Sequence, residues 1–487
     1  MIKLRPYQEK LISDIRESFR TGNRRVLAVL PTAGGKTVCF SYIAAGVYKS
    51  EKRVLIIAHR RELLKQISDS LKMFGIRHAI LQGGTRGIPR TNVVVASVFT
   101  VASRLKHWPA PDLIIGDEAH HFTPDSTWGK VVAAFPKARV LGVTATPIRS
   151  DGAGLGLMFD DMVIGPTVSE LTDLGFLAPA EVYAPSVPDL KGIRSRGGDY
   201  AVSELEELMG KSTLTGDAVK HYLSLCMGKK AVAFCVSVKH AEQVADAFRQ
   251  AGVRAASVDG SMEVAKRDGI LKALETGGID VLTSCDLISE GFNLPAVEVA
   301  ILLRPTKSTG LYIQQVGRSL RIAPGKTHCT VLDHANCTRM HGFIDDERDW
   351  ELTTEKADKR GKGEQAETVR TCPECFAAHR PMPECPKCGH VYQTKAREVK
   401  SVEGDLEKLE RGEKGVKQVD WQRQYYQLVR VAERRGVGNP KAWAFNIVCN
   451  QEAKRRAGKR DVFGEQLING LTATERNEIR ERTMGHG

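Results

Sequence analysis

Two adjacent carboxylates, Asp117 and Glu118, follow the short apolar run Leu113–Ile115. A run of this length and composition predicts a buried strand, whose end would present both carboxylates at the edge of a sheet. There the first carboxylate can hold Mg²⁺, and the second can orient and deprotonate an attacking water, as in nucleotide hydrolysis. A strand that ends in acids is often only a capped turn, so this interpretation depends on the rest of the chain.

A glycine-rich turn, Pro31–Thr37, follows the apolar run Val26–Leu30 and precedes a helical pattern. In that context, small residues let main-chain N–H groups approach phosphates, and the helix N-terminus favours their negative charge. Lys36 would reach the β- and γ-phosphates, and Thr37 would bind Mg²⁺ together with Asp117. Leu30 replaces the first glycine of the usual pattern, so an ordinary turn before a helix is the alternative. The predicted nucleotide-binding residues of this turn are Ala33, Gly34, Gly35, Lys36 and Thr37.

Short Val/Ile/Leu-rich runs alternate with helical patterns in two blocks of the sequence. Continuous apolar strands separated by helices indicate parallel sheets that are covered on both faces. We therefore predict an α/β protein with two such domains, 1–166 and 212–342, joined by a connecting segment, 167–211. The strand candidates are Val26–Leu30, Val54–Ala58, Val93–Ala96, Leu113–Ile115 and Arg139–Val143 in the first block, and Ala231–Cys235, Ala255–Val258, Val281–Thr283, Val299–Leu303 and Cys329–Leu332 in the second.

The composition favours a polyanionic partner. The 487 residues carry a formal net charge of +13, and such a charge supports binding to the phosphates of nucleic acid. No apolar run approaches the roughly 18 residues that a membrane span needs, and the N-terminus lacks the apolar stretch of a signal peptide. Seven of the eleven cysteines are scattered, several of them within apolar strands, which fits buried thiols in a reducing compartment. We therefore expect a cytoplasmic protein with no membrane partner.

The other four cysteines form two Cys-x₂-Cys pairs separated by nine residues: Cys372, Cys375, Cys385 and Cys388. Four thiolates in a short, turn-rich segment without an apolar core predict a tetrahedral Zn²⁺ site that holds the segment together. We divide the rest of the chain into a charged linker (343–368), a zinc ribbon (369–392), a second charged linker (393–417) and a basic, mostly helical C-terminal region (418–487).

The C-terminal region opens with an amphipathic pattern. Trp421, Tyr425, Leu428 and Ala432 recur at helical spacing, with arginines roughly opposite. Such a stripe packs against a neighbour more often than it stacks on bases, and both interpretations stay open.

Together, these stretches resemble the superfamily 2 helicases of the DEAD/DEAH type. The resemblance extends over residues 4–321, and its elements occur in the order that the family has. They are Leu4–Gln8 (before motif I), Pro31–Thr37 (motif I), Ile57–Gln66 (Ia), Asp117–His120 (II), Thr144–Pro147 (III), Ser289–Pro295 (V) and Gln314–Arg321 (VI). Thr146–Gly152 and Leu302–Thr306 look more like the helicases related to type III restriction subunits and their phage-encoded relatives.

The resemblance implies two RecA-like domains in tandem, with ATP and Mg²⁺ in the cleft between them, followed by the zinc ribbon and the helical region. It implies that Lys36, Asp117, Glu118, Gln314, Arg318 and Arg321 are catalytic, with both arginines as fingers on the γ-phosphate. Gln8 would recognise adenine, Gly291 and Asn293 would bind the nucleotide, Thr144 and Thr146 would couple hydrolysis to movement, and His59, Arg60, Ser97 and Thr100 would contact nucleic acid. The chain departs from the family at two positions. Ala33, next to Gly34, stands where the family usually has Gly, and Asn293 stands where the family often has Asp.

The favoured function is therefore an ATP-dependent helicase that acts on single-stranded or branched DNA. A duplex DNA translocase or branch-migration motor is the first alternative, because translocation and strand separation are separable. An RNA helicase, or a nucleic-acid-binding adaptor built on the zinc ribbon, is the further alternative. The sequence predicts no particular protein partner.

Overall fold

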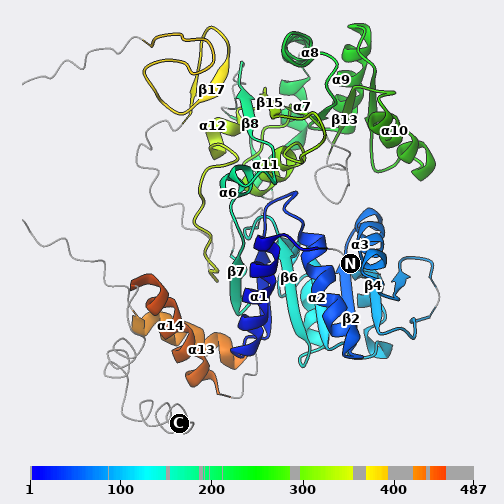
Figure 1. The fold of residues 1–487 in the computed structure, drawn as a ribbon, viewed down its shortest axis with the longest axis vertical. Helices are drawn as coiled ribbons and strands as arrows, with labels where there is room; N and C mark the ends of the chain where they lie inside the picture. The colour runs from blue at the N-terminus through cyan, green and yellow to red at the C-terminus, as the bar shows by residue number, and fades with distance from the viewer. Residues whose placement is uncertain are drawn as a thin grey trace, which may run out of the picture. The chain divides into compact units, whose positions relative to one another are not determined.

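The computed structural model describes residues 3–85, 87–149, 154–185, 190, 192–196, 198–210, 212–285, 297–354, 369–392, 421–434 and 439–456. The chain divides into two compact units, Met1–Thr394 and Lys395–Gly487. The first unit contains two α/β lobes and the four-cysteine segment, and the second contains a pair of helices (Figure 1). The α/β fold class is confirmed.

Lobe one is built on a parallel sheet of seven strands among the described residues, in the order β3-β4-β2-β5-β6-β1-β7. Alternate residues of each strand face opposite sides: in β1, Val26 and Ala28 join one apolar cluster, and Leu27 and Val29 join another. Burial on both faces explains why the strands read as continuous apolar runs. The strands are β1 (Arg25–Val29), β2 (Val54–Ala58), β3 (Ala79–Leu81), β4 (Val93–Ser97), β5 (Leu113–Asp117), β6 (Arg139–Thr144) and β7 (Asp161–Ile164).

Helices cover both faces of this sheet. On one face lie α1 (Pro6–Arg20), α2 (Lys36–Lys49) and α3 (Arg61–Met73), whose apolar residues share a cluster with Val26. On the other face lie α4 (Val98–Ala102) and α5 (Thr127–Ala134), which pack with Leu27. The short 3₁₀ turns η1 (Leu105–His107) and η2 (Ala119–His121) complete the lobe.

Lobe two contains an eight-stranded sheet in the described part of the chain, in the order β12-β13-β11-β14-β15-β8-β17-β16. The strands from β12 to β8 are parallel, whereas β17 pairs antiparallel with β8 and β16 pairs antiparallel with β17. The strands are β8 (Ala180–Tyr183), β11 (Ala231–Phe234), β12 (Ala255–Val258), β13 (Val281–Ser284), β14 (Val299–Leu302), β15 (Cys329–Asp333), β16 (Arg370–Thr371) and β17 (Ala377–His379).

The helices of lobe two also lie on both faces of their sheet. The apolar residues of α7 (Val202–Met209), α8 (Ser212–Cys226) and α9 (Val238–Gln250) share one cluster. Those of α10 (Val264–Thr276), α11 (Thr309–Gly317) and α12 (Cys337–His341) join the cluster that also contains α1–α3. One apolar cluster therefore runs through both lobes. The remaining elements are α6 (Val168–Asp173) and a two-strand pair, β9 (Ser195–Arg196) and β10 (Asp199–Tyr200).

The structure adds strands that the sequence does not predict: β3, β7, β8, β9, β10, β16 and β17. Every predicted strand is present, with ends that agree to within two residues. The domain boundaries stay a prediction. The structure shows that β8, within the predicted connecting segment, belongs to the sheet of lobe two, and that β17 of the four-cysteine segment extends the same sheet.

The second unit contains α13 (Trp421–Arg434) and α14 (Pro440–Arg456), which pack on each other. Tyr425 and Ala432 of the predicted stripe are fully buried, and Tyr425 shares an apolar cluster with Val429, Ala444 and Phe445. The stripe therefore serves packing at these positions. Among the helices that the structure describes, none combines the length and apolar character required to span a lipid bilayer.

Because α3 buries only one of its faces, substitutions on its buried and exposed faces should differ in their effect on the free energy of unfolding. Ile67 is fully buried, whereas Met73 on the same helix is 69% exposed. We expect Ile67→Ala to lower the free energy of unfolding by about 2–5 kcal/mol, because it leaves a cavity in the core. Met73→Ala should change that energy by about 0.5 kcal/mol or less. Thermal melts of the two variants against the unsubstituted protein measure the difference, and equal melting temperatures would contradict the packing described for α3.

Candidate nucleotide and zinc sites

The turn Pro31–Thr37 connects β1 to α2, and α2 begins at Lys36. Ala33 and Gly35 take left-handed conformations, with φ of 68° and 88°, whereas Gly34 does not. Ala33, at the position where the family usually has glycine, therefore adopts the left-handed conformation itself, and the adjacent Gly34 does not adopt it in its place. For an L-residue this costs about 1–2 kcal/mol. Gly34 serves a different need, since a Cβ there would lie 2.9 Å from Leu30 Cγ.

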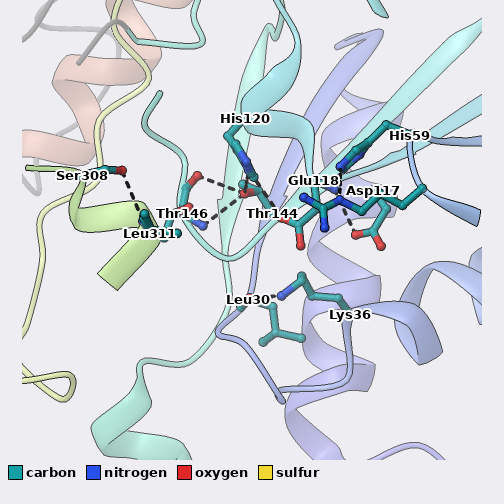
Figure 2. Close-up of polar contacts among 11 residues, drawn as sticks. Leu30, Lys36, His59, Asp117, Glu118, His120, Thr144, Thr146, Ser308 and Leu311 are labelled. Carbon is teal, nitrogen blue, oxygen red and sulfur yellow. Dashed lines mark hydrogen bonds and ion pairs between the residues drawn. The ribbon is translucent and has the colours of Figure 1, made fainter. Parts of the chain in front are cut away.

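Lys36 lies at the mouth of this turn, with its ammonium Nζ donating a long hydrogen bond of 3.4 Å to the carbonyl of Leu30. Burial lowers the pKa of Lys36, while the carboxylates of Glu118 and Asp117 oppose that shift. Figure 2 shows Lys36 with Asp117 and Glu118 in one group of side chains. A long bond to one carbonyl leaves the ammonium able to donate to a phosphate oxygen.

The two carboxylates occupy the end of β5, as predicted. Both are buried, and the main-chain N–H of Glu118 donates to Asp117 Oδ1 at 3.1 Å. Burial, with the neighbouring Glu118 carboxylate adding to it, raises the pKa of Asp117. Glu118 has a φ of 54°, and this left-handed turn separates the directions of the two side chains. A divalent cation would offset the charge that burial disfavours here.

A chain of polar contacts leads from Glu118 to motif III and on towards lobe two (Figure 2). His120 Nδ1 lies 3.4 Å from Glu118 Oε2 and 3.2 Å from Thr144 Oγ1. The Thr144 hydroxyl donates to the Thr146 carbonyl at 3.0 Å and accepts from its N–H at 3.1 Å. Thr146 Oγ1 lies 3.3 Å from the point that a Cβ on Gly310 would occupy, at the start of α11. The predicted coupling residues thus lie between the carboxylates and lobe two.

Lobe two approaches the phosphate-binding turn so closely that a side chain is excluded. A Cβ added to Gly317 would lie 2.6 Å from Thr32 Cβ, which is closer than real Cβ contacts come. Gly317 ends α11, next to the predicted arginine fingers, and Thr32 belongs to the turn of lobe one. Glycine at this position allows the two lobes to touch.

Between the lobes lies a cavity of about 330 Å³. Both lobes contribute charged or polar side chains to it, so the structure brings together most of the predicted catalytic and nucleotide-binding residues. Its lining includes Ala33, Gly35, Lys36, Thr37, Asp117 and Glu118 from lobe one, and Gln314, Arg318 and Arg321 from lobe two.

Sequence reasoning misses other residues that line the cavity, among them Arg5, Phe176 and Ile322. The guanidinium of Arg5 lies over the ring of Phe176, 4.4 Å from its centroid. Arg5 falls within Leu4–Gln8, the element before motif I, so its place in the sequence could have indicated that it lies near the nucleotide site. Phe176 lies between α6 and β8 and carries no sequence signal, because only the fold brings that segment to the site.

Two predicted nucleotide-binding residues, Gln8 and Gly34, do not line the cavity, and the structure does not describe two others. Gln8 is buried and is not part of the cavity lining; its Oε1 accepts the Arg5 N–H at 3.0 Å at the start of α1, and its side chain packs against Gly35. Gly291 and Asn293 lie outside the described residues.

The candidate nucleic-acid contacts lie at the carboxyl ends of β2 and β4. His59 and Arg60 are half-buried, and Arg60 Nε donates to His59 Nε2 at 3.2 Å. Ser97 is half-buried at the start of α4, whereas Thr100 is buried within that helix. Thr100 therefore has less access to a strand than the other three, and all four roles stay predictions.

The four cysteines converge in space, with all Sγ atoms within 4.8 Å of one another. Cys372 Sγ lies 3.6 Å from Cys388 Sγ, and Cys375 Sγ lies 3.8 Å from Cys385 Sγ. Four thiolates at Zn–S distances of about 2.3 Å on a tetrahedron are separated by about 3.8 Å, so the cluster fits Zn²⁺. His379 uses both ring nitrogens elsewhere, on the Arg380 carbonyl and the Tyr392 hydroxyl, each at 2.7 Å.

The cluster is joined to lobe two. In register, Ala377 and Ala378 of β17 pair with Tyr183 and Val182 of β8. Lys387 forms an ion pair of 2.9 Å with Glu181 of the same strand. Cys372 and Cys385 belong to the apolar cluster that covers one face of lobe two. The four-cysteine segment is therefore an edge of that lobe's sheet.

Comparison with known protein families gives two matches, in the order of the two lobes. Residues 1–149 match the family described as "Type III restriction enzyme, res subunit", and residues 216–323 match the "Helicase conserved C-terminal domain".

Two relatives illustrate the similarity. A 51.5 kDa protein of a Lactococcus phage is 33% identical over 384 residues, covering 78% of this chain and 81% of the phage protein. IRC3 of Saccharomyces cerevisiae, a predicted ATP-dependent helicase, is 31% identical over 351 residues. That match covers 68% of this chain and 51% of the yeast protein, so the chain spans about half of its length.

Solved structures support the fold. A fragment of a predicted HsdR subunit of a type I restriction enzyme from Vibrio vulnificus superposes with a TM-score of 0.57 at 22% identity, covering 70% of this chain and 65% of that one. The ATP-dependent type ISP restriction-modification enzyme LlaBIII bound to DNA gives a TM-score of 0.50 at 17% identity, covering 68% and 27%. With residues of motifs I, Ia, II and VI lining one cavity and the families matched in order, the chain belongs to the ATP-hydrolysing superfamily 2 helicases that resemble type III restriction subunits and phage helicases.

Proposed function

We propose that the chain uses ATP hydrolysis to translocate on DNA and to unwind it. The observation that carries this proposal is the single cavity that Lys36, Asp117 and Glu118 of lobe one share with Arg318 and Arg321 of lobe two. Because the site is complete only when both lobes contribute, binding and loss of the nucleotide would change the separation of the lobes. Repeated closure and opening can move a bound strand.

In this proposal, lobe one holds the nucleotide. Main-chain N–H groups of the turn and the start of α2 cradle the phosphates, and Lys36 donates to the β- and γ-phosphates. Thr37 and Asp117 would hold Mg²⁺, which neutralises developing charge on the phosphates when it is bound. Glu118 orients the attacking water and accepts its proton, and its contact with His120 fits a carboxylate held in one orientation.

Lobe two supplies the positive charge that the transition state requires. Arg318 and Arg321 reach the cavity from the end of α11, and Gln314 lines it one turn earlier. An arginine that stabilises the charge of a transferring phosphoryl group contributes about 10³–10⁵ in rate in other NTPases. Because both arginines belong to lobe two, hydrolysis would be fast only when the lobes are closed.

For the base, we propose that Arg5 and Phe176 form the binding surface. Their stacked arrangement at the cavity wall suits the flat face of adenine. Gln8 would then affect nucleotide binding indirectly, by supporting the phosphate-binding turn, because it caps α1 and packs against Gly35. We keep Gly291 and Asn293 as motif V contacts to the nucleotide, on the strength of the resemblance alone.

The coupling path would run through Thr144 and Thr146. A change at Glu118 would reach Thr144 through His120, and Thr146 touches the start of α11, whose other end carries the arginines. His59, Arg60, Ser97 and Thr100 are proposed to contact the strand, mostly through its phosphates, so little sequence preference is expected.

DNA is favoured over RNA as the partner because the first lobe matches a restriction-enzyme family and a structural neighbour is bound to DNA. The net charge of +13 suits either nucleic acid. A duplex DNA translocase without strand separation is the second candidate, since restriction-type relatives share the same lobes.

The four-cysteine segment is proposed to bind one structural Zn²⁺ through Cys372, Cys375, Cys385 and Cys388. The spacing of their Sγ atoms supports this assignment. The segment has little apolar core of its own, so the metal would provide the fixed geometry that lets β17 pair with β8. We propose the domain division given by the sequence, with this segment docked on lobe two.

Steady-state ATP hydrolysis in moderate salt, without nucleic acid and with single-stranded DNA, blunt duplex DNA or RNA, tests the proposed function. Single-stranded DNA should give the largest stimulation, and Lys36→Ala should abolish turnover, because no other side chain can replace the ammonium at the phosphates. Lys10→Ala, at an exposed lysine of α1, serves as the control and should keep full activity. Stimulation by blunt duplex alone would favour the translocase, stimulation by RNA alone would favour an RNA helicase, and normal turnover in Lys36→Ala would reject the proposed site.

Closure of the lobes can be tested at Gly317. A methyl group there would overlap Thr32 and keep the lobes apart, so Gly317→Ala should lower kcat by about 10- to 100-fold, as small displacements of reacting groups do. Gly269→Ala is the matched control, because a Cβ at Gly269 in α10 meets nothing within 4 Å. Unchanged kcat in Gly317→Ala would show that the working enzyme does not bring these residues together.

Zinc content can be measured by elemental analysis of the purified protein. We expect one Zn²⁺ per chain, lost in Cys375→Ser because three thiolates hold the metal more weakly. The same variant should melt at a lower temperature, since β17 would lose its support at the edge of lobe two. His390→Ala, which alters a half-buried neighbour outside the cluster, should keep the metal. A metal-free protein with unchanged melting would contradict the assignment.

A further inference from the structure

Lys326 is not one of the predicted site residues, yet its ammonium is fully hydrogen-bonded beside motif VI. Lys326 Nζ donates to the carbonyls of Val297 at 2.7 Å and Arg321 at 2.8 Å, and also to the carbonyl of Ser319. A lysine ammonium has three N–H donors, so each has a main-chain acceptor. Hydrogen bonds from a charged donor are stronger than neutral ones, particularly where water is excluded.

The three acceptor carbonyls belong to two different segments of the main chain. Ser319 and Arg321 lie just beyond the end of α11, where carbonyls have no helical partner. Val297 is the first described residue after residues 286–296, and it lies near the start of β14. Lys326 therefore joins the main chain that carries the arginines to the segment that leads into β14, an inner strand of the sheet.

The same short stretch is held from its other side. Ala178 N–H donates to the Leu320 carbonyl at 2.8 Å, and Leu177 forms an antiparallel bridge with Arg321. With Lys326 on one side and Leu177 and Ala178, just before β8, on the other, the main chain of Arg321 has little freedom. Burial lowers the pKa of Lys326, in keeping with an ammonium enclosed by protein.

We propose that Lys326 is a positioning residue for ATP hydrolysis, which fixes the main chain from Ser319 to Arg321 so that the guanidinium of Arg321 enters the cavity correctly aimed. The inference rests on the proposed role of Arg321 as an arginine finger. Lys326 does not line the cavity, so its effect on the reaction passes through Arg321. It should therefore influence turnover and leave ATP binding largely unchanged.

The test compares Lys326→Met, Lys326→Arg, Arg321→Ala and the double variant Lys326→Met/Arg321→Ala by kcat and KM for ATP with single-stranded DNA. Lys326→Met should lower kcat by about 10- to 100-fold, as displacement of a catalytic group does, with KM within about threefold of the starting value. Lys326→Arg, which keeps the charge and the donors, should recover most of the loss. In the Arg321→Ala background, Lys326→Met should cause no further loss.

The outcomes separate the inference from the function on which it depends. Normal kcat in Arg321→Ala would reject the finger role itself. A full additional loss in the double variant, or a loss in Lys326→Met that appears in KM alone, would overturn the positioning role while leaving the finger intact. Lys272→Met, at an exposed lysine of α10, controls for loss of a charge on lobe two. If Lys326→Met fails to fold, Lys326→Gln replaces it, and full kcat in that variant would overturn the proposal.

Discussion

The approach of Gly317 to Thr32 determines what the rest of the molecule can do, because it joins the end of α11 to the phosphate-binding turn without a side chain between them. With that contact, the arginines of lobe two share a cavity with Lys36 and the two carboxylates. The apolar cluster that α1–α3 share with α10–α12 also helps to hold the two lobes together. A hydrolytic site divided in this way makes chemistry conditional on the arrangement of two bodies, which is the property a motor requires.

The sheet of lobe two carries additional strands at one edge. It continues past β15 into β8, and then into β17 of the four-cysteine segment. The residues just before β8 contact the arginine stretch: the Ala178 N–H donates to the Leu320 carbonyl, and Leu177 bridges Arg321. The strand β8 that follows them pairs with β17. The four-cysteine segment, for which we propose a Zn²⁺ site, is therefore connected through β8 to the residues that contact the arginine stretch.

The sequence predicts the inner strands well because they are buried on both faces and therefore read as unbroken apolar runs. It misses β7, whose residues are only partly buried, and β8, in which the acidic Glu181 interrupts the apolar pattern. It also misses β17, which is three residues long and depends on the neighbouring cysteines for its place. Element order and strand ends follow from local composition, whereas edge strands depend on partners that are distant in the sequence.

The same reason separates the predicted site residues from the missed ones. Lys36, Asp117 and Arg318 lie within stretches whose residue types reveal their chemistry, and all three line the cavity. Phe176 and Lys326 lie in unremarkable segments, and their positions follow from how β8 and motif VI meet. Gln8, which the resemblance implies to recognise adenine, is buried at the start of α1 outside the cavity lining, and its role stays a prediction.

The buried charges of the cavity favour the binding of a nucleotide with its metal. Lys36, Arg318 and Arg321 face Asp117 and Glu118 across a small space, and burial lowers the pKa of Lys36 and Arg321 while it raises the pKa of Asp117. Burial therefore disfavours the charged forms of Lys36, Arg321 and Asp117. A polyphosphate with its metal would supply partners for both signs at once, since phosphate oxygens match the cations and the metal matches the carboxylates. In the proposed function, closure of the lobes would then be favoured when the ligand is present and opposed when it leaves, so that nucleotide turnover would open and close the cavity.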